Sequence, residues 1–205
     1  MYSILVVDDS PMIVDVFVAM LERGGYDPSA CYSGPECLEK LKEITPDLIL
    51  LDIMMEPMDG WETLENIKSN PSTKSIPVMM LTAKQLTPDE AQEYGAYIED
   101  YVMKPTTHRQ LYEAIEYILK RKQNIIDEIQ VAKGAGIEEK IVDEFERLSK
   151  SVDVSKRLFK ILESTYNLND DEMKIGENIA QAIKSMQMSI RLQEERLNQI
   201  KKSFK

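Results

Sequence analysis

The sequence has few of the residues that most often carry catalysis or covalent cross-links. Its 205 residues include two cysteines and one histidine. Cys31 and Cys37 are too few for a disulfide framework or a zinc site, and they indicate reduced thiols in a cytoplasmic protein. The one histidine is His108, so residues 123–205 contain none. This absence excludes a histidine kinase dimerisation domain and a histidine phosphotransfer module from that region.

Long apolar runs and an excess of positive charge are also missing. No run approaches the ~20 apolar residues that a membrane span requires, and the first ten residues indicate a strand rather than a signal peptide. Residues 1–122 carry 21 acids against 11 bases, and residues 123–205 carry 15 acids against 14 bases. Neither part is basic enough to favour nucleic acid.

Short apolar runs alternate with amphipathic stretches five times up to about residue 121. The run Leu48–Leu51 is apolar on both faces, which is typical of a parallel strand covered by helices on each side. This alternation predicts an α/β fold with a doubly wound, flavodoxin-like, five-stranded parallel sheet in the order 2-1-3-4-5. The expected strands are Ser3–Val7, Pro28–Tyr32, Asp47–Leu51, Val78–Leu81 and Tyr101–Met103.

Long helices are expected after Pro105. The first covers 106–133 and is ended by Gly134-Ala135-Gly136, and the second covers about 137–166. A third follows a turn and N-cap at 167–170. Apolar residues recur in all three at alternating spacings of four and three, which is typical of a helical bundle or coiled coil. The stripes either pack the helices on one another or form a dimer seam or partner-binding face. The expected domains are 1–121 and 122–205, with the last helix of the first continuing into the second.

Acidic residues follow two neighbouring strands of the expected sheet. Asp8 and Asp9 come after the first strand, and Asp52 comes after the third. In the expected strand order these two strands are adjacent, so the three carboxylates face one crevice. They would repel one another unless a hard cation joined them. The pattern therefore predicts Mg²⁺ or Mn²⁺, with Asp9 and Asp52 as direct ligands and Asp8 binding directly or through water.

The segments that carry these residues resemble the response-regulator receiver family of two-component signalling over residues 1–121. The resemblance rests on the acidic pair, on LILLDIMMEPMDGWE around Asp52, and on the VMMLTAK and YVMKP segments. It implies that Asp52 accepts a phosphoryl group from a sensor histidine kinase or a phosphotransfer protein. It also implies that Asp8, Asp9, Asp52 and the backbone carbonyl of Met54 hold the metal.

The same resemblance assigns roles near the ends of the last two strands. Lys104 pairs with Asp52 at rest and with the phosphoryl group afterwards, and its bond to Pro105 is expected to be cis. Thr82 and Tyr101 form a switch pair: the Thr82 hydroxyl binds a phosphoryl oxygen, and Tyr101 turns inward. The family usually has proline four residues after the acceptor, where this chain has Glu56. That carboxylate is either solvated or in contact with a metal-bound water.

The helical region offers no motif for an enzyme. We therefore predict a response regulator whose only chemistry is its own phosphorylation and autodephosphorylation. Its helices would serve as a protein-interaction or dimerisation output, without a membrane partner. The alternative is a DNA-binding transcriptional regulator, because Lys150–Lys160 is locally basic and could begin a recognition helix.

Overall fold

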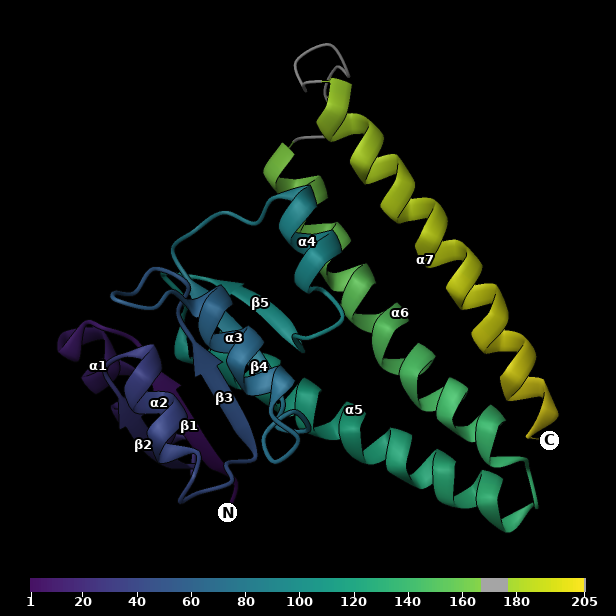
Figure 1. Ribbon diagram of the computed structural model, residues 1–205, viewed down its shortest axis with the longest axis horizontal. Helices are drawn as coiled ribbons and strands as arrows, with labels where there is room; N and C mark the ends of the chain where they lie inside the picture. Colours follow the sequence, from purple (N-terminus) through teal and green to yellow (C-terminus); the bar gives the residue numbers. More distant parts are fainter. Residues whose placement is uncertain (167–176, 205) are drawn as a thin grey trace. The chain divides into compact units, whose positions relative to one another are not determined.

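The structure is a computed structural model that describes residues 1–166 and 177–204 (Figure 1). Its strands form one five-stranded parallel sheet in the expected order, β2-β1-β3-β4-β5. Four strands differ from the expected bounds by one residue, because ladder pairing sets their ends: Asp27 pairs with Ser3, and Thr82 pairs with Met103. The strands are β1 Ser3–Val7, β2 Asp27–Cys31, β3 Leu48–Leu51, β4 Val78–Thr82 and β5 Asp100–Met103.

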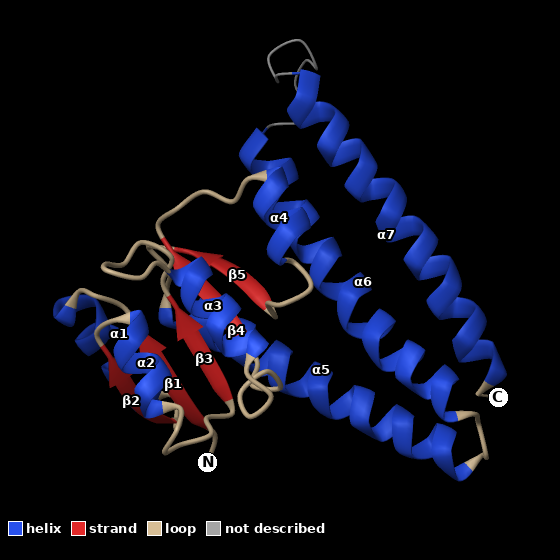
Figure 2. Cartoon of the chain, in the orientation of Figure 1, coloured by secondary structure: helices blue, strands red, loops and turns tan. Residues whose placement is uncertain are grey.

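Three helices pack near the first strands. They are α1 Pro11–Arg23, α2 Gly34–Lys40 and α3 Gly60–Ser69. Helix α1 contacts β1 and β2, while α2 and α3 contact each other and cross the near face of the sheet (Figure 2). All four residues of β3 are buried, in agreement with a strand covered on both faces. Asp59 caps α3 by accepting a hydrogen bond from the Glu62 N–H at 2.8 Å. This bond fixes the start of α3, directly after the loop that follows β3.

Reciprocal capping hydrogen bonds begin two later helices. Helix α4 covers Pro88–Tyr94, and Thr87 and Glu90 form a reciprocal capping box at its start. Helix α5 covers His108–Gly134, and Thr107 exchanges hydrogen bonds with Gln110 in the same way. At the start of α1 the Ser10 side chain makes no capping hydrogen bond.

Helix α6 covers Glu139–Tyr166, and α7 covers Glu177–Ser203. Gly136 separates α5 from α6 with φ +75°, a conformation that favours glycine. The expected turn at 167–170 lies outside the described residues. The four-three spacing predicts one apolar stripe in α6, which includes Phe145, Val152 and Leu162. The structure buries more than this stripe, because Val142, Val154 and Leu158 are buried as well. The physical reason is that α6 contacts both α7 and α4.

The chain divides into two compact units. Unit 1 contains residues 1–85 and 97–113, and unit 2 contains residues 86–96 and 114–205. In this division α5 begins in unit 1 and continues in unit 2, and α4 belongs to unit 2. The boundary after residue 121 stays a prediction. Among the described helices, none combines the length and apolar character that a membrane crossing requires.

Both cysteines are buried in unit 1. Burial raises the pKa of the Cys31 thiol to about 11 and that of the Cys37 thiol to about 12. Because the thiolate is the reactive form, we expect neither cysteine to react with an aromatic disulfide reagent in the folded protein at mildly alkaline pH. Both should react once denaturant unfolds the chain. Rapid labelling of either thiol under native conditions would contradict this expectation.

Candidate functional site at the carboxyl ends of the strands

The carboxyl ends of four strands bring together polar residues that are far apart in the sequence. Asp8 follows β1, Asp52 follows β3, Thr82 ends β4 and Lys104 follows β5. The Lys104 ammonium donates hydrogen bonds to Asp52 Oδ2 at 2.9 Å and to Asp8 Oδ2. The bond between Lys104 and Pro105 is cis, as expected. These contacts join β1, β3 and β5 through one cation.

Asp52 is held in place by its own loop. The N–H groups of Ile53 and Met54 donate to Asp52 Oδ1 at 2.7 and 3.2 Å. The residue is 7% exposed, so its carboxylate is largely shielded from water and depends on these partners. The two oxygens therefore differ: Oδ1 is bound to the backbone, and Oδ2 faces Lys104.

Asp8 is 3% exposed. Its Oδ1 accepts a hydrogen bond from the Ser10 N–H at 2.9 Å. Burial raises the pKa of the Asp8 carboxyl, and the hydrogen bond from Lys104 opposes that rise. A buried carboxylate that lies near a second one is stabilised by added positive charge. The pair Asp8 and Asp52 therefore forms a cation-binding position, which the Lys104 ammonium fills in this arrangement.

The other expected metal ligands lie beside this pair along the chain. Asp9 is exposed, and Met54 is 60% exposed. Within the described ranges, no group of three or more His, Cys, Asp and Glu side chains is arranged to hold a metal ion. The oxygen donors of Asp8 and Asp52 nevertheless suit a hard cation such as Mg²⁺, and their joint contact with an ammonium shows that this position favours positive charge.

Thr82 and Tyr101 are linked through the backbone of Lys84. The Lys84 N–H donates to Thr82 Oγ1 at 3.2 Å, and the Tyr101 hydroxyl donates to the Lys84 carbonyl at 2.7 Å. Thr82 is fully buried, and Tyr101 is 3% exposed. The structure thus places Tyr101 inward and joins both expected switch residues to one backbone segment.

Two neighbours of the site were not assigned to it from the sequence, which placed Gly60 only in the turn that enters the next helix. The Trp61 ring is stacked on Tyr101, with centroids 6.5 Å apart and planes at 30°. Gly60 packs against the Asp52 backbone, and its N–H donates to the Ile53 carbonyl at 2.9 Å. Trp61 is the single tryptophan of the chain and directly follows Asp59-Gly60, a signal that could have marked it. Glu56, the departure from the family pattern, is exposed.

Gly60→Ala is expected to lower the free energy of unfolding by about 2 kcal/mol, because a Cβ would lie 2.1 Å from the Asp52 carbonyl oxygen and the backbone must shift. The matched control is Gly134→Ala at the end of α5, where a Cβ meets nothing within 4 Å. Urea unfolding of the two variants measures the difference. Equal stability of Gly60→Ala and wild type would contradict the close packing described for Gly60.

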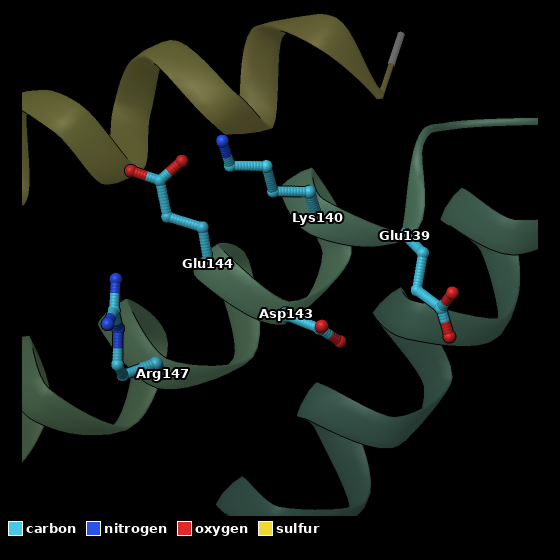
Figure 3. A pocket seen from close by; sticks show the side chains of 5 residues that line it. All are labelled: Glu139, Lys140, Asp143, Glu144 and Arg147. Atoms are coloured by element: carbon cyan, nitrogen blue, oxygen red, sulfur yellow. The ribbon is translucent and has the colours of Figure 1, made fainter.

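A pocket lies on the surface of α6, in unit 2. Figure 3 shows the five charged side chains that line it, Glu139, Lys140, Asp143, Glu144 and Arg147. Arg196 of α7 donates to Glu144 from Nε at 2.8 Å and from Nη2 at 2.7 Å, and its hydrogen bond lowers the pKa of Glu144. The Glu144–Arg196 ion pair therefore joins α6 to α7 at this pocket.

Comparison with protein families gives two matches. A family model described as response regulator receiver domain matches residues 4–116. A second model, described as Metanogen output domain 2, matches residues 121–205.

Curated relatives match over the first part of the chain. The DNA-binding dual master transcriptional regulator RpaA of Synechocystis sp. is 32% identical over 61% of this chain and 52% of its own length. The Bacillus subtilis alkaline phosphatase synthesis transcriptional regulatory protein PhoP is 36% identical over 59% of this chain and 50% of its own length. The chain thus spans about half the length of these curated relatives.

Solved structures match over the same part. The N-terminal domain of a response regulator receiver protein from Methanoculleus marisnigri JR1 is 74% identical, with a TM-score of 0.50, over 58% of this chain and 97% of that chain. A CheY-like receiver domain protein from Methanospirillum hungatei JF-1 is 28% identical, with a TM-score of 0.56, over 60% of this chain and 98% of that chain.

Proposed function

Because the chain belongs to the response regulator receiver family, we propose that it accepts a phosphoryl group on Asp52 from a sensor histidine kinase or a phosphotransfer protein. The observation that carries this proposal is the buried carboxylate at the end of β3. It is oriented by two backbone N–H groups and faces the Lys104 ammonium beside Asp8. Phosphoryl transfer depends mainly on positioning and on charge stabilisation, which this arrangement can provide.

We assign the attack to Asp52 Oδ2, because Oδ1 is engaged by the Ile53 and Met54 N–H groups. The bond from this oxygen to phosphorus forms as the bond from phosphorus to the donor's histidine nitrogen breaks, and the neutralised histidine leaves with the donor protein. Lys104 then transfers its ammonium contact from the carboxylates to the phosphoryl oxygens. Asp8, Asp9, Asp52 and the Met54 carbonyl would hold Mg²⁺ or Mn²⁺. A bound divalent ion neutralises negative charge on the transferring oxygens.

Thr82 and Tyr101 are proposed to report the state of Asp52. The Thr82 hydroxyl binds a phosphoryl oxygen, and the inward position of Tyr101 is favoured when it does so. Because both residues bind the Lys84 backbone, a change at the hydroxyl alters the start of the segment that leads to α4. This is a population shift between two arrangements, driven by a local charge.

For the output we propose protein interaction or dimerisation through the C-terminal helices, with no catalysis beyond the receiver's own phosphoryl chemistry. DNA binding is the second candidate, since RpaA is named as a DNA-binding regulator. Basic residues of Lys150–Lys160 are engaged within unit 2: Lys156 pairs with Glu194, and Arg157 lies over the Tyr117 ring. This engagement favours the protein-interaction output.

The test uses the full chain with beryllofluoride, which mimics a phosphoryl group on a carboxylate. We expect tight binding in the presence of Mg²⁺ and at least tenfold weaker binding without it. Binding that needs no divalent cation, or no binding at all, would contradict the proposal. Light scattering with and without beryllofluoride tests dimerisation, and salt-dependent binding to mixed duplex DNA would instead support the second candidate.

A further inference from the structure

Helix α7 has a buried face and an exposed face within unit 2. Its buried residues are Ile183, Ile190 and Ile200, and it contacts α6 and α4. On the opposite side, exposed residues recur at spacings of three, four or seven positions, which places them on one face of a helix. We call this surface the outer face of α7 and define it as Glu177, Lys184, Met188, Leu192, Glu195 and Lys202.

The centre of the outer face is apolar. Met188 is 58% exposed and Leu192 is 59% exposed, and the two residues lie about one helical turn apart. Charged residues flank them on both sides along the helix. An apolar centre with a polar rim is the usual composition of a protein–protein interface, so the outer face has the composition of a surface that a partner covers.

Other charges of α7 are engaged inside unit 2. Three of them form ion pairs with α5 and α6: Glu194 with Lys156, Arg196 with Glu144, and Lys201 with Glu128. On the outer face, Glu195 accepts a hydrogen bond at Oε1 from Arg191 of the same helix at 3.1 Å. That bond leaves Glu195 on the surface, where its second oxygen can accept from a cation of another molecule.

The charges of the outer face are self-complementary when two copies run in opposite directions. From the N-terminal end the order is acidic, basic, apolar, apolar, acidic and basic. An antiparallel pair with its two-fold axis near residue 190 brings together positions that lie almost equally far from that residue, and each contact occurs twice. The facing pairs are Glu177 with Lys202, Gln181 with Gln199, Lys184 with Glu195, and Met188 with Leu192.

The same charges disfavour the opposite orientation. A parallel pair in register would place Lys184 on Lys184 and Glu195 on Glu195, and like charges in contact oppose association. The whole chain carries a net charge of −11, so two copies repel one another on average. The outer face has two acids and two bases and is neutral, so a second copy meets no net repulsion there.

We propose that the outer face of α7 is a homodimer interface, in which α7 of one copy packs antiparallel on α7 of a second copy. This inference rests on the interaction output of the proposed function and names its partner, another molecule of this chain. Burial of Met188 and Leu192 favours the association. The ion pairs set its orientation and register, since charge complementarity contributes specificity more than affinity.

The experiment reverses one charge pair in the full chain. Sedimentation equilibrium measures the dimer dissociation constant of Lys184→Glu, of Glu195→Lys and of their equimolar mixture, with and without beryllofluoride and Mg²⁺. Each variant alone brings like charges together twice, so we expect its dimer to be about tenfold weaker than that of wild type. In the mixture each variant supplies the charge that the other requires, so mixed dimers should recover the wild-type affinity.

The matched control is Lys122→Glu, which makes the same change at an exposed residue of α5 and should dimerise as wild type does. Circular dichroism verifies that each variant folds. An equal loss in Lys122→Glu would attribute the effect to overall charge and overturn the inference. Wild-type affinity in both single variants, or a mixture as weak as its components, would overturn it as well.

A wild type that stays monomeric with and without beryllofluoride would also overturn the inference, and it would leave a different protein as the occupant of the outer face. Beryllofluoride affinity, measured by calorimetry on the same samples, reports separately on phosphoryl acceptance by Asp52. Failure of the dimer and failure of the proposed phosphoryl acceptance are therefore distinguishable.

Discussion

Lys104→Met is expected to lower the free energy of unfolding by about 3 kcal/mol at neutral pH, because it leaves two buried carboxylates without their shared cation. Asp8 and Asp52 both bind the Lys104 ammonium, and methionine keeps the apolar stem while removing the charge. The rate of phosphoryl acceptance should also fall about a hundredfold, as when one charge-stabilising donor is removed. Urea unfolding and acetyl phosphate labelling measure the two effects.

The matched control is Lys42→Met. Lys42 pairs with Glu39 in an exposed setting, so its removal should change stability by less than about 1 kcal/mol. Adding Mg²⁺ should restore part of the stability lost in Lys104→Met, since a divalent ion can replace the missing charge.

The stability deficit of Lys104→Met should also depend on pH. Burial raises the pKa of Asp8, so this carboxyl takes up a proton more readily in the folded chain than in the unfolded chain. A carboxyl whose pKa is raised by folding lowers the free energy of unfolding at pH values above that raised pKa, where it must be ionised. This destabilisation shrinks as the pH falls through the raised pKa toward the pKa of the unfolded chain. The deficit should therefore shrink on acidification below neutral pH. A deficit that grows on acidification would contradict the description of the pair.

Asp52→Asn is expected to abolish phosphoryl incorporation while preserving the fold. The amide oxygen can still accept the Ile53 and Met54 hydrogen bonds that Asp52 Oδ1 accepts, but the amide nitrogen cannot attack phosphorus as a carboxylate does. Labelling with acetyl phosphate and Mg²⁺ measures the loss, and circular dichroism verifies the fold.

The matched control for this variant is Asp27→Asn. It makes the same chemical change at an exposed residue where β2 begins, so incorporation should equal that of wild type. Full incorporation into Asp52→Asn would contradict the proposed acceptor, and a loss in Asp27→Asn would indicate a general effect of charge.

The sheet and its order were predictable because alternating strands and helices leave few topologies. Runs such as Leu48–Leu51 can lie only between two covering layers. The edge that carries Asp8 and Asp52 then follows, since the residue after each parallel strand emerges on the same side. Strand ends were displaced by one residue where backbone pairing continued past the apolar run, as at Asp27 and Thr82.

Contacts made by backbone atoms and by short helices were not predictable. The Lys84 backbone that joins Thr82 to Tyr101 has no side-chain signature, because any residue provides the same N–H and carbonyl. Helix α4 has seven residues, and its buried residues are small. Such residues could pack against a sheet as well as against a pair of helices. Only the fold shows that it packs on α6 and α7, which also explains why α6 is buried beyond the stripe seen in the sequence.

The proposal that Asp52 accepts the phosphoryl group is tested most directly by locating the modified residue. The full chain is treated with acetyl phosphate and Mg²⁺, reduced with borohydride, which converts an aspartyl phosphate to homoserine, and mapped by peptide mass spectrometry. Homoserine at position 52, absent when Mg²⁺ is withheld, is the predicted result. Homoserine at position 8 or 9, or phosphate found on His108 with residue 52 unchanged, would contradict the account.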